Sequence, residues 1–366
     1  MYVLTREDAR HRSTVVTVRH IDVTLHLEEA ATEKSSYRVV SRMTLVSQEP
    51  SLFVDVAGEV QRVSIDDVPL ASGQFTYDGE RLDISAVPIK REVTISVEAD
   101  CRFSTTGEGL HRYRDPEDGR YYLYTQFEPE DAHRAWPCFD QPDIKPTWTF
   151  HVYAPREWVV TSNGIGSSKD CGNGIALWDF TTTAPLSSYI TAVVAGQWAV
   201  IEGGCWEGSA GDGNTATLQL RLLCRQALAS SMDSDDILAV TRAGLDHYHE
   251  HYGYTFPWGS YDQIFVPEYN LGAMENPGCI TFNENYLSRD TPSFALRQKR
   301  ANTILHEMCH MWFGDLVTPA WWENLWLKES FAENQGTTTA AEATIYAGEW
   351  ASFAIGRKAW ALAQDQ

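Results

Sequence analysis

Two histidines and a glutamate near the C-terminus constrain this chain more than any other feature. His306 and His310 stand four positions apart in the stretch HEMCH, and Glu329 follows after eighteen intervening residues. Residues four apart on a helix project from one face, so the two imidazoles can converge on a single Zn²⁺. Glu329, from a second helix, would be the third ligand and would leave a fourth position open for water. The pattern predicts two packed helices and a zinc hydrolase site.

The same spacing also fits an ordinary amphipathic helix whose histidines happen to lie one turn apart. Two observations favour the metal site. The turn-prone pair Thr318-Pro319 separates the histidines from a second helix-forming run, residues 325–347, which contains the glutamate. A metzincin site would need glycine at Phe313 and histidine at Leu316, and because no histidine follows His310, any third ligand downstream must be a carboxylate.

Two further stretches carry a resemblance to a known family. GAMEN occupies residues 272–276, about thirty positions before the first histidine, and TQFEPEDAHRAWPCFDQPDIK covers residues 125–145. Together with HExxH and the distant glutamate, these stretches resemble the aminopeptidase N family of zinc metallopeptidases, the gluzincins. The resemblance covers nearly the whole chain. It implies one Zn²⁺ per chain and peptide substrates with a free N-terminus.

The resemblance also implies a role for each residue of the metal site. His306, His310 and Glu329 would bind the zinc ion. Glu307 would be the catalytic general base, which takes a proton from water and passes it to the departing amine. The placement of Glu307 beside the open metal position is the reason for this assignment.

An exopeptidase must in addition hold the α-ammonium of its substrate at a fixed distance from the metal. Carboxylates do this well in a half-buried site, and the resemblance assigns the task to Glu128 and Glu275. Glycine permits close approach of an extended substrate backbone. The remaining substrate-binding residues implied by the resemblance are Gln126, Gly272, Ala273 and Met274.

The sequence departs from the commonest text of the family around the third ligand. Asn324 stands where aspartate is usual, Lys328 where asparagine is usual, and Ser330 where glycine is common. The family's aspartate would orient a zinc histidine, so Asn324 is expected to do this less strongly. The family's oxyanion tyrosine is expected about sixty residues after Glu329, where this sequence has only Tyr346, much earlier and in a helix-like run. We therefore expect a chain truncated within its catalytic domain, complete only with a missing C-terminal segment or partner chain.

Composition narrows the possible partners and the compartment. The formal net charge of −21 argues against binding to nucleic acid or to anionic membranes. The first residues, MYVLTREDARHRS, lack the apolar core of a signal peptide, and no run approaches transmembrane length. The seven cysteines are scattered without metal-type pairing, which is typical of reduced thiols. A cytoplasmic location is predicted.

The spacing of apolar residues predicts a mixed fold in two domains. An antiparallel β-rich domain is expected over residues 1–203, similar to the saddle-shaped N-terminal domain of the family, and an incomplete α+β thermolysin-like catalytic domain over residues 204–366. A Gly/Ser-rich loop is expected at 203–214 near the boundary. The predicted strands are 16–28, 37–47, 91–99, 146–155, 189–202, 217–224 and 263–268. The predicted helices are 233–251, capped by Asp233 or Ser234, and 296–313.

Three functions remain open at this point. The first is a zinc aminopeptidase. The second is an epoxide hydrolase similar to leukotriene hydrolases, although those relatives have glutamine where this chain has Glu128. The third is a zinc- and peptide-binding remnant without the oxyanion tyrosine, whose loss typically costs about 10²–10³ in rate.

Overall fold

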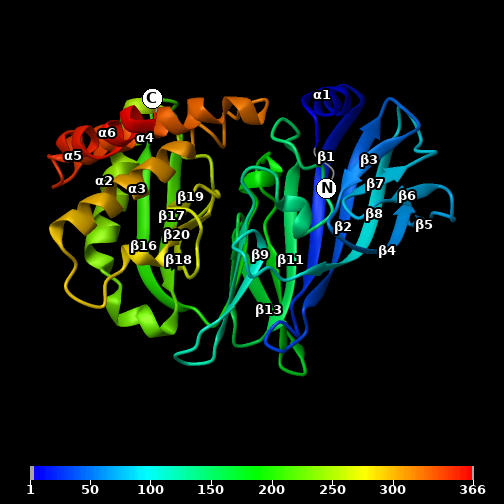
Figure 1. The fold of residues 1–366 in the computed structure, drawn as a ribbon, viewed down its shortest axis with the longest axis horizontal. Helices are drawn as coiled ribbons and strands as arrows, with labels where there is room; N and C mark the ends of the chain where they lie inside the picture. The colour runs from blue at the N-terminus through cyan, green and yellow to red at the C-terminus, as the bar shows by residue number, and fades with distance from the viewer. Residues whose placement is uncertain (1–3, 365–366) are drawn as a thin grey trace. The chain divides into compact units, whose positions relative to one another are not determined.

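The computed structural model describes residues 4–364, which form two compact units. The first unit extends to Trp198 and also includes Thr318–Trp322. The second comprises Ala199–Val317 and the residues from Glu323 onward. Strands dominate the first unit, whereas the second combines one sheet with the helices near the C-terminus (Figure 1).

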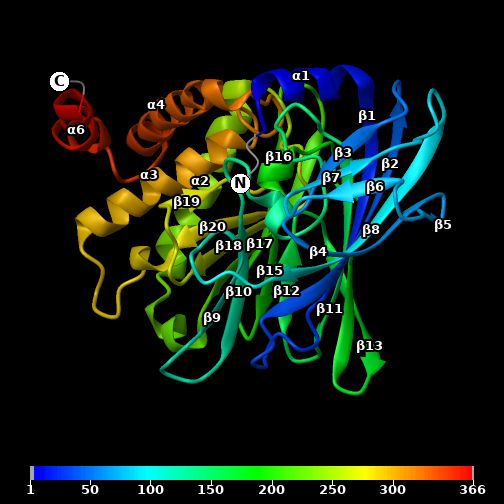
Figure 2. The same ribbon diagram turned by 45° about the vertical axis from the view of Figure 1, so that its right-hand side comes forward.

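The largest element of the first unit is an eight-stranded sheet with the order β13-β14-β11-β1-β2-β8-β4-β5 (Figure 2). All neighbouring strands are antiparallel except the pair β1 and β11, which is parallel. The strands are β1 (Val16–His26), β2 (Ser36–Ser47), β4 (Gly58–Ile65), β5 (Val68–Pro69), β8 (Glu92–Arg102), β11 (Thr147–Pro155), β13 (Gly166–Gly172) and β14 (Ile175–Phe180).

Alternation of apolar and polar residues explains why these segments form strands. In β8 every second residue from Val93 to Cys101 is buried, because successive side chains of a strand point to opposite faces. The predicted strands 16–28, 37–47, 91–99 and 146–155 are confirmed as β1, β2, β8 and β11, apart from their ends.

Two smaller sheets complete the first unit. One has the order β12-β15-β10-β9 and the other the order β3-β7-β6. Their strands are β3 (Leu52–Asp55), β6 (Phe75–Tyr77), β7 (Arg81–Ile84), β9 (Gly109–Arg114), β10 (Tyr121–Gln126), β12 (Val159–Ser162) and β15 (Val193–Gly196).

Two sequence-based expectations for the first unit are wrong. The single strand expected over 189–202 is divided into β15 and β16 (Ala199–Ser209), because the chain turns at Gly196, whose φ of +154° is unfavourable for residues with a side chain. The N-terminal segment, for which no helix was expected, forms α1 (Arg6–Val15). Thr5 caps this helix by accepting a hydrogen bond from the Asp8 amide, a local signal for a helix start.

The second unit is built on a five-stranded sheet with the order β16-β17-β18-β20-β19. Its other strands are β17 (Thr215–Cys224), β18 (Tyr261–Val266), β19 (Ala273–Met274) and β20 (Cys279–Asn283). Only residues 210–214 of the Gly/Ser-rich stretch 203–214 form the expected loop, because β16 continues to Ser209 and pairs with β17 through a register shift near Gly203 and Gly204. β16 runs through residues 203 and 204, where the domain boundary is expected, and the chain passes from the first compact unit to the second after Trp198. The expected boundary stays a prediction.

The second unit also contains α-helices, which include the segments with His306, His310 and Glu329 (Figure 1). They are α2 (Ser234–Tyr252), α3 (Phe294–His310), α4 (Leu325–Ala343), α5 (Glu349–Ile355) and α6 (Arg357–Gln364). α3 packs against both α2 and α4, which also contact each other. The predicted helices 233–251 and 296–313 are confirmed as α2 and α3, with ends displaced by one to three residues. Asp233 is the N-cap of α2, but its carboxylate pairs with Arg297 and Arg300 instead of capping the helix. No helix within residues 4–364 combines the length and the apolarity that crossing a bilayer requires.

Candidate metal centre

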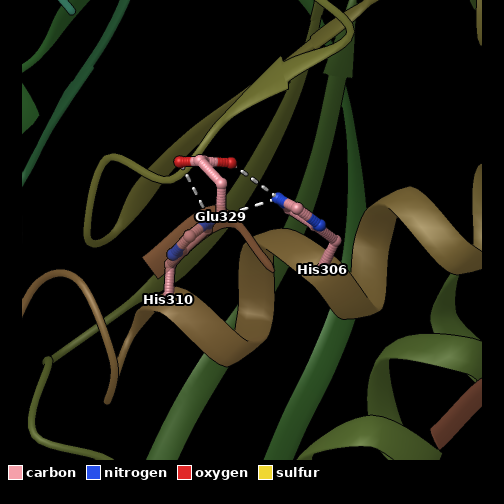
Figure 3. Close-up of side chains that lie close together, drawn as sticks. All are labelled: His306, His310 and Glu329. Carbon is pink, nitrogen blue, oxygen red and sulfur yellow. Dashed lines mark hydrogen bonds and ion pairs between the residues drawn. The ribbon is translucent and has the colours of Figure 1, made fainter. Parts of the chain in front are cut away.

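α3 holds both histidines in a buried setting. Ser293 caps the start of the helix, where its side chain accepts a hydrogen bond from the amide of Leu296. The C-terminal end of the helix contains His306, whose side chain is 13% exposed, and His310, whose side chain is 1% exposed. Since the two residues are one turn apart, their imidazoles project from the same side, as Figure 3 shows.

Glu329, near the start of α4, faces the two imidazoles (Figure 3). Its Oε2 lies 3.2 Å from His306 Nε2, and its Oε1 lies 3.6 Å from His310 Nε2. The two Nε2 atoms are themselves 3.2 Å apart. Three potential ligand atoms thus face one small volume, and these residues could hold a metal ion.

The second ring nitrogen of His310 fixes the tautomer of its imidazole. Nδ1 donates a hydrogen bond of 3.1 Å to the carbonyl oxygen of Phe313, so the lone pair that can bind a metal is on Nε2. Gly314 makes this contact possible: its φ is +146°, and a Cβ there would lie 2.9 Å from His310 Nδ1. The turn after α3 therefore requires glycine.

The second ring nitrogen of His306 faces a different group. Its Nδ1 lies 3.5 Å from Oε2 of Glu333, which in turn pairs with Arg357. Glu333 is one turn after Glu329 on α4, so one helix presents two carboxylates to the same imidazole. The role expected for Asn324 is not seen, because Asn324 is the N-cap of α4 and the second nitrogens of the histidines face Phe313 and Glu333.

Close approach of α3 and α4 brings the glutamate to the histidines. At Gly336 a Cβ would lie 2.9 Å from the backbone nitrogen of His306 and 3.2 Å from the carbonyl oxygen of Asn302. The same contact includes a hydrogen bond of 3.2 Å from the Asn302 amide group to Thr337 Oγ1. Because the neighbouring atoms are backbone, only glycine permits this spacing.

Two further carboxylates lie next to the group. An oxygen of Glu307, an oxygen of Glu275 and a nitrogen of His310 all lie within 4.8 Å of one another. Burial raises the pKa of Glu307 to about 8; His306 opposes this rise and Glu275 adds to it. Burial would also raise the pKa of Glu275, but the neighbouring Lys328 ammonium outweighs this effect and the pKa is lowered.

Burial likewise opposes ionisation of Glu329, yet hydrogen bonds with His306 and His310 hold its pKa well below the usual range. His306 behaves in the complementary way: burial disfavours its charged form, but Glu329 and Glu307 raise its pKa. Glu329 and His306 thus stabilise each other's charged form.

The GAMEN segment forms the edge of the sheet in the second unit. β19, which consists of Ala273 and Met274, ends the strand order and pairs with β20. Met274 is 1% exposed, whereas Gly272 is exposed and accepts a hydrogen bond from the Asn283 amide. An edge strand can pair with an extended peptide, and Glu275 directly follows this one.

Glu128 and Gln126, the other residues expected to bind substrate, belong to the first unit. Gln126 is the last residue of β10 and is buried, and Glu128 is half-buried in the loop that follows. The structure thus brings together His306, Glu307, His310, Glu329 and Glu275 within one unit, whereas Glu128 lies in the other unit. Tyr346 lies beyond the end of α4, where its hydroxyl donates to Asp236.

Sequence reasoning missed three residues that shape the centre. Glu333 could have been found, since Glu329 and Glu333 have the same four-residue spacing as the histidines. Gly336 gave no signal, because a glycine inside a helical run does not reveal which helix packs against it. Lys328 was noticed as a departure from the family text, but the sequence assigned it no partner.

The fold and the centre define the class of protein. The Peptidase M1 N-terminal domain matches residues 22–190, and the Peptidase family M1 domain matches residues 237–366. The chain therefore belongs to peptidase family M1, a family of metallopeptidases, and its resemblance to the aminopeptidase N family is confirmed.

Individual relatives agree with this assignment. Aminopeptidase N of Streptomyces lividans is 40% identical over 99% of this chain and 41% of its own length. Probable aminopeptidase 1 of Sulfurisphaera tokodaii is 30% identical over 76% of this chain and 35% of its own length. Aminopeptidase N of Bos taurus is 32% identical over 61% of this chain and 23% of its own length. The chain thus spans less than half the length of each of these relatives.

Proposed function

We propose that this chain carries the zinc centre and the amine-binding carboxylates of an aminopeptidase that removes N-terminal residues from peptides. The observation that carries the proposal is the mutual placement of His306, His310 and Glu329. Membership of family M1 and the names of the relatives support a peptidase with a free-amine requirement. The remaining support comes from the fit of the residues to a metal ion and from the neighbours of Glu307.

The spacing of the three ligand atoms suits zinc. Ligand atoms about 2.0–2.1 Å from a tetrahedral Zn²⁺ lie about 3.3 Å from each other. In this chain the two Nε2 atoms lie 3.2 Å apart, Glu329 Oε2 lies 3.2 Å from that of His306, and Glu329 Oε1 lies 3.6 Å from that of His310. Two imidazoles and one carboxylate are also the donor set of catalytic zinc sites, which keep a fourth position open. When bound, zinc would polarise the substrate carbonyl and make water more acidic.

Glu307 is the residue placed to move a proton. It follows His306 on α3, is 6% exposed, and lies within 4.8 Å of a His310 nitrogen. A carboxylate in this position can accept a proton from the attacking water and pass it to the departing amine. Its buried surroundings raise its affinity for a proton, which suits this transfer.

The substrate would bind along β19, with its N-terminal ammonium group directed towards the carboxylate of Glu275. Glu275 directly follows the edge strand, so an extended peptide paired with β19 would have its N-terminus near this carboxylate and the metal centre. Glu128 would supply a second carboxylate, with Gln126 and Met274 beside the first side chain. A cytoplasmic location also stays a prediction, and its support is that all seven cysteines are free thiols.

The test uses the 366-residue chain loaded with zinc and an aminoacyl-arylamide as substrate. We expect one zinc ion per chain and cleavage that a chelator stops. Glu307→Gln should keep the zinc and lose about 10²–10⁴ in kcat, the usual contribution of a general base. Glu342→Gln removes an exposed carboxylate from α4 and serves as the matched control with unchanged activity.

Three outcomes would contradict parts of the proposal. If acetylated substrates are cleaved as fast as free ones, Glu128 and Glu275 do not bind the amine. If the chain binds zinc stoichiometrically but shows no turnover, it is a zinc- and peptide-binding remnant, the alternative raised by the position of Tyr346. Hydrolysis of an epoxide with no cleavage of arylamides would favour the leukotriene-hydrolase-like alternative.

A further inference from the structure

Lys328 is a buried cation in direct contact with both functional parts of the centre. Its side chain is 1% exposed, and its ammonium donates to Oε1 of Glu275 and, at 2.6 Å, to Oε1 of Glu329. Glu275 is equally inaccessible at 3% side-chain exposure. A lysine is almost never fully buried unless it is paired, and here both partners belong to the proposed site.

The ammonium of Lys328 contacts one oxygen of each of the two carboxylates. On Glu329, Oε1 accepts from Lys328 and also lies 3.6 Å from His310 Nε2, while Oε2 faces His306 Nε2 at 3.2 Å. On Glu275, Oε1 accepts from Lys328, so a ligand ammonium would bind through the other oxygen. One ammonium therefore connects the carboxylate assigned to the metal with the carboxylate assigned to the substrate amine.

The reach of lysine is essential to this arrangement. Consecutive residues of a helix do not face each other, so the stem of Lys328 must fold back for its ammonium to contact Glu329. Asparagine, which is usual in the family at this position, is shorter and uncharged and could not bridge the same two groups. The cation also lies between two carboxylates that would otherwise repel each other in a buried setting.

We infer that Lys328 is a positioning residue. It sets the distance between the carboxylate of Glu275, which would bind the substrate amine, and the carboxylate of Glu329, which would bind the metal. It thereby determines how strongly the site prefers a ligand with a free amine. This inference rests on the proposed function. Lys328 would act through its two partners, the carboxylates of Glu275 and Glu329.

The experiment compares the binding of leucinamide and of its des-amino analogue to the zinc-loaded chain by calorimetry. The ratio of their affinities measures the preference for a free amine. In Lys328→Met, a neutral variant of similar length, we expect this ratio to fall about tenfold or more, and zinc affinity to fall about 10-fold to 100-fold, as for other contacts that orient a metal ligand. Lys358→Met removes an exposed charge from α6 in the same unit and should leave both quantities unchanged.

A double-mutant cycle separates positioning from general destabilisation. In a Glu275→Gln background, Lys328→Met should no longer change the amine preference, because the carboxylate that it positions is gone. Persistence of the effect in that background would overturn the inference. So would a rise in amine preference in Lys328→Met, which would show that the lysine merely competes with the ligand ammonium, or an unchanged preference with a lower melting temperature.

The wild-type chain distinguishes this inference from the proposed function. If wild type prefers leucinamide and Lys328→Met retains that preference, the inference fails and the proposed function stands. If wild type binds zinc but shows no preference for the amine, the amine-binding role of Glu275 fails, and the inference fails with it.

Discussion

Two segments that resemble the same family are held in different ways in this structure. The candidate metal ligands are on two packed helices, where one-turn spacing sets the geometry and two glycines permit the close contacts. The segment 125–145, which contains Glu128, is mostly irregular and is held by polar contacts with residues far away in the sequence. The comparison shows that a helical site depends on local spacing and close packing, whereas a loop site depends on its distant partners.

The polar contacts of the loop form one connected network. Asp140 accepts hydrogen bonds from the backbone and ring of His133, at 3.0 and 2.9 Å, and from the Ser188 hydroxyl at 2.7 Å. The amide of Asp140 donates to Asp55, whose carboxylate also pairs with the buried guanidinium of Arg12 at 2.6 Å. Strands, a helix and the loop are thus tied together through buried charges.

The largest effect should come from breaking the contact between α3 and α4. In Gly336→Val the new side chain would overlap the backbone at His306, so the helices must separate and Glu329 must move away from the imidazoles. We expect zinc affinity to fall at least about 100-fold, which exceeds the usual effect of a change outside the ligands. Competition with a chromophoric chelator measures this.

Gly348→Val is the control for that experiment, since a Cβ at this position meets no atom within 4 Å. Zinc binding by Gly336→Val with wild-type affinity would show that the spacing of α3 and α4 does not set the metal site.

The helical part of the site was largely predictable from sequence. The spacing of His306 and His310 and the helix-forming run around Glu329 required no knowledge of distant residues. What the sequence could not show is how these helices are held: Gly336 and Lys328 act through contacts across helices, and their residue types alone do not identify a partner. The exact turn after His310 likewise depends on a backbone conformation at Gly314.

A medium effect should come from breaking the network of the loop. Asp140→Asn removes a buried negative charge and leaves the ring of His133 without its ionic partner. Removing one member of a buried ion pair usually costs about 3–5 kcal/mol, so the urea midpoint should fall clearly. Zinc affinity, which depends on the other segment, should stay within about twofold. A large loss of zinc affinity in the folded variant would contradict the separation of the two segments.

The loop network explains why this segment was the less predictable one. Residues 125–145 resemble the family in sequence, but the partners of Asp140 are at positions 55, 133 and 188, and no short-range pattern connects them. α1, which supplies Arg12, was not expected either. Its capping signal at Thr5 is local, but the reason for its burial is again a contact with the distant Asp55.

The smallest effect is a dependence of stability on pH. Burial disfavours the charged form of His133, but the hydrogen bond and charge of Asp140 outweigh it and raise the pKa of His133 from 6.5 to about 9. The folded state therefore binds the proton more tightly than the unfolded state. The stabilisation is complete below about pH 6.5, falls as the pH rises and is lost above about pH 9.

The comparison of wild type with His133→Gln tests this. The free energy of unfolding of wild type should exceed that of the variant by about 1–3 kcal/mol more at pH 6 than at pH 9.5, the size expected for a pKa shift of this kind. His11→Gln is the matched control, because its imidazole pairs with Glu49 on the surface and such pairs contribute little. A difference between wild type and His133→Gln that stays constant from pH 6 to pH 9.5 would mean that His133 supports the loop by packing and neutral hydrogen bonds. In that case the helical segment and the loop segment 125–145 would differ in whether their contacts are local or distant in sequence, and buried charge would not be part of the difference.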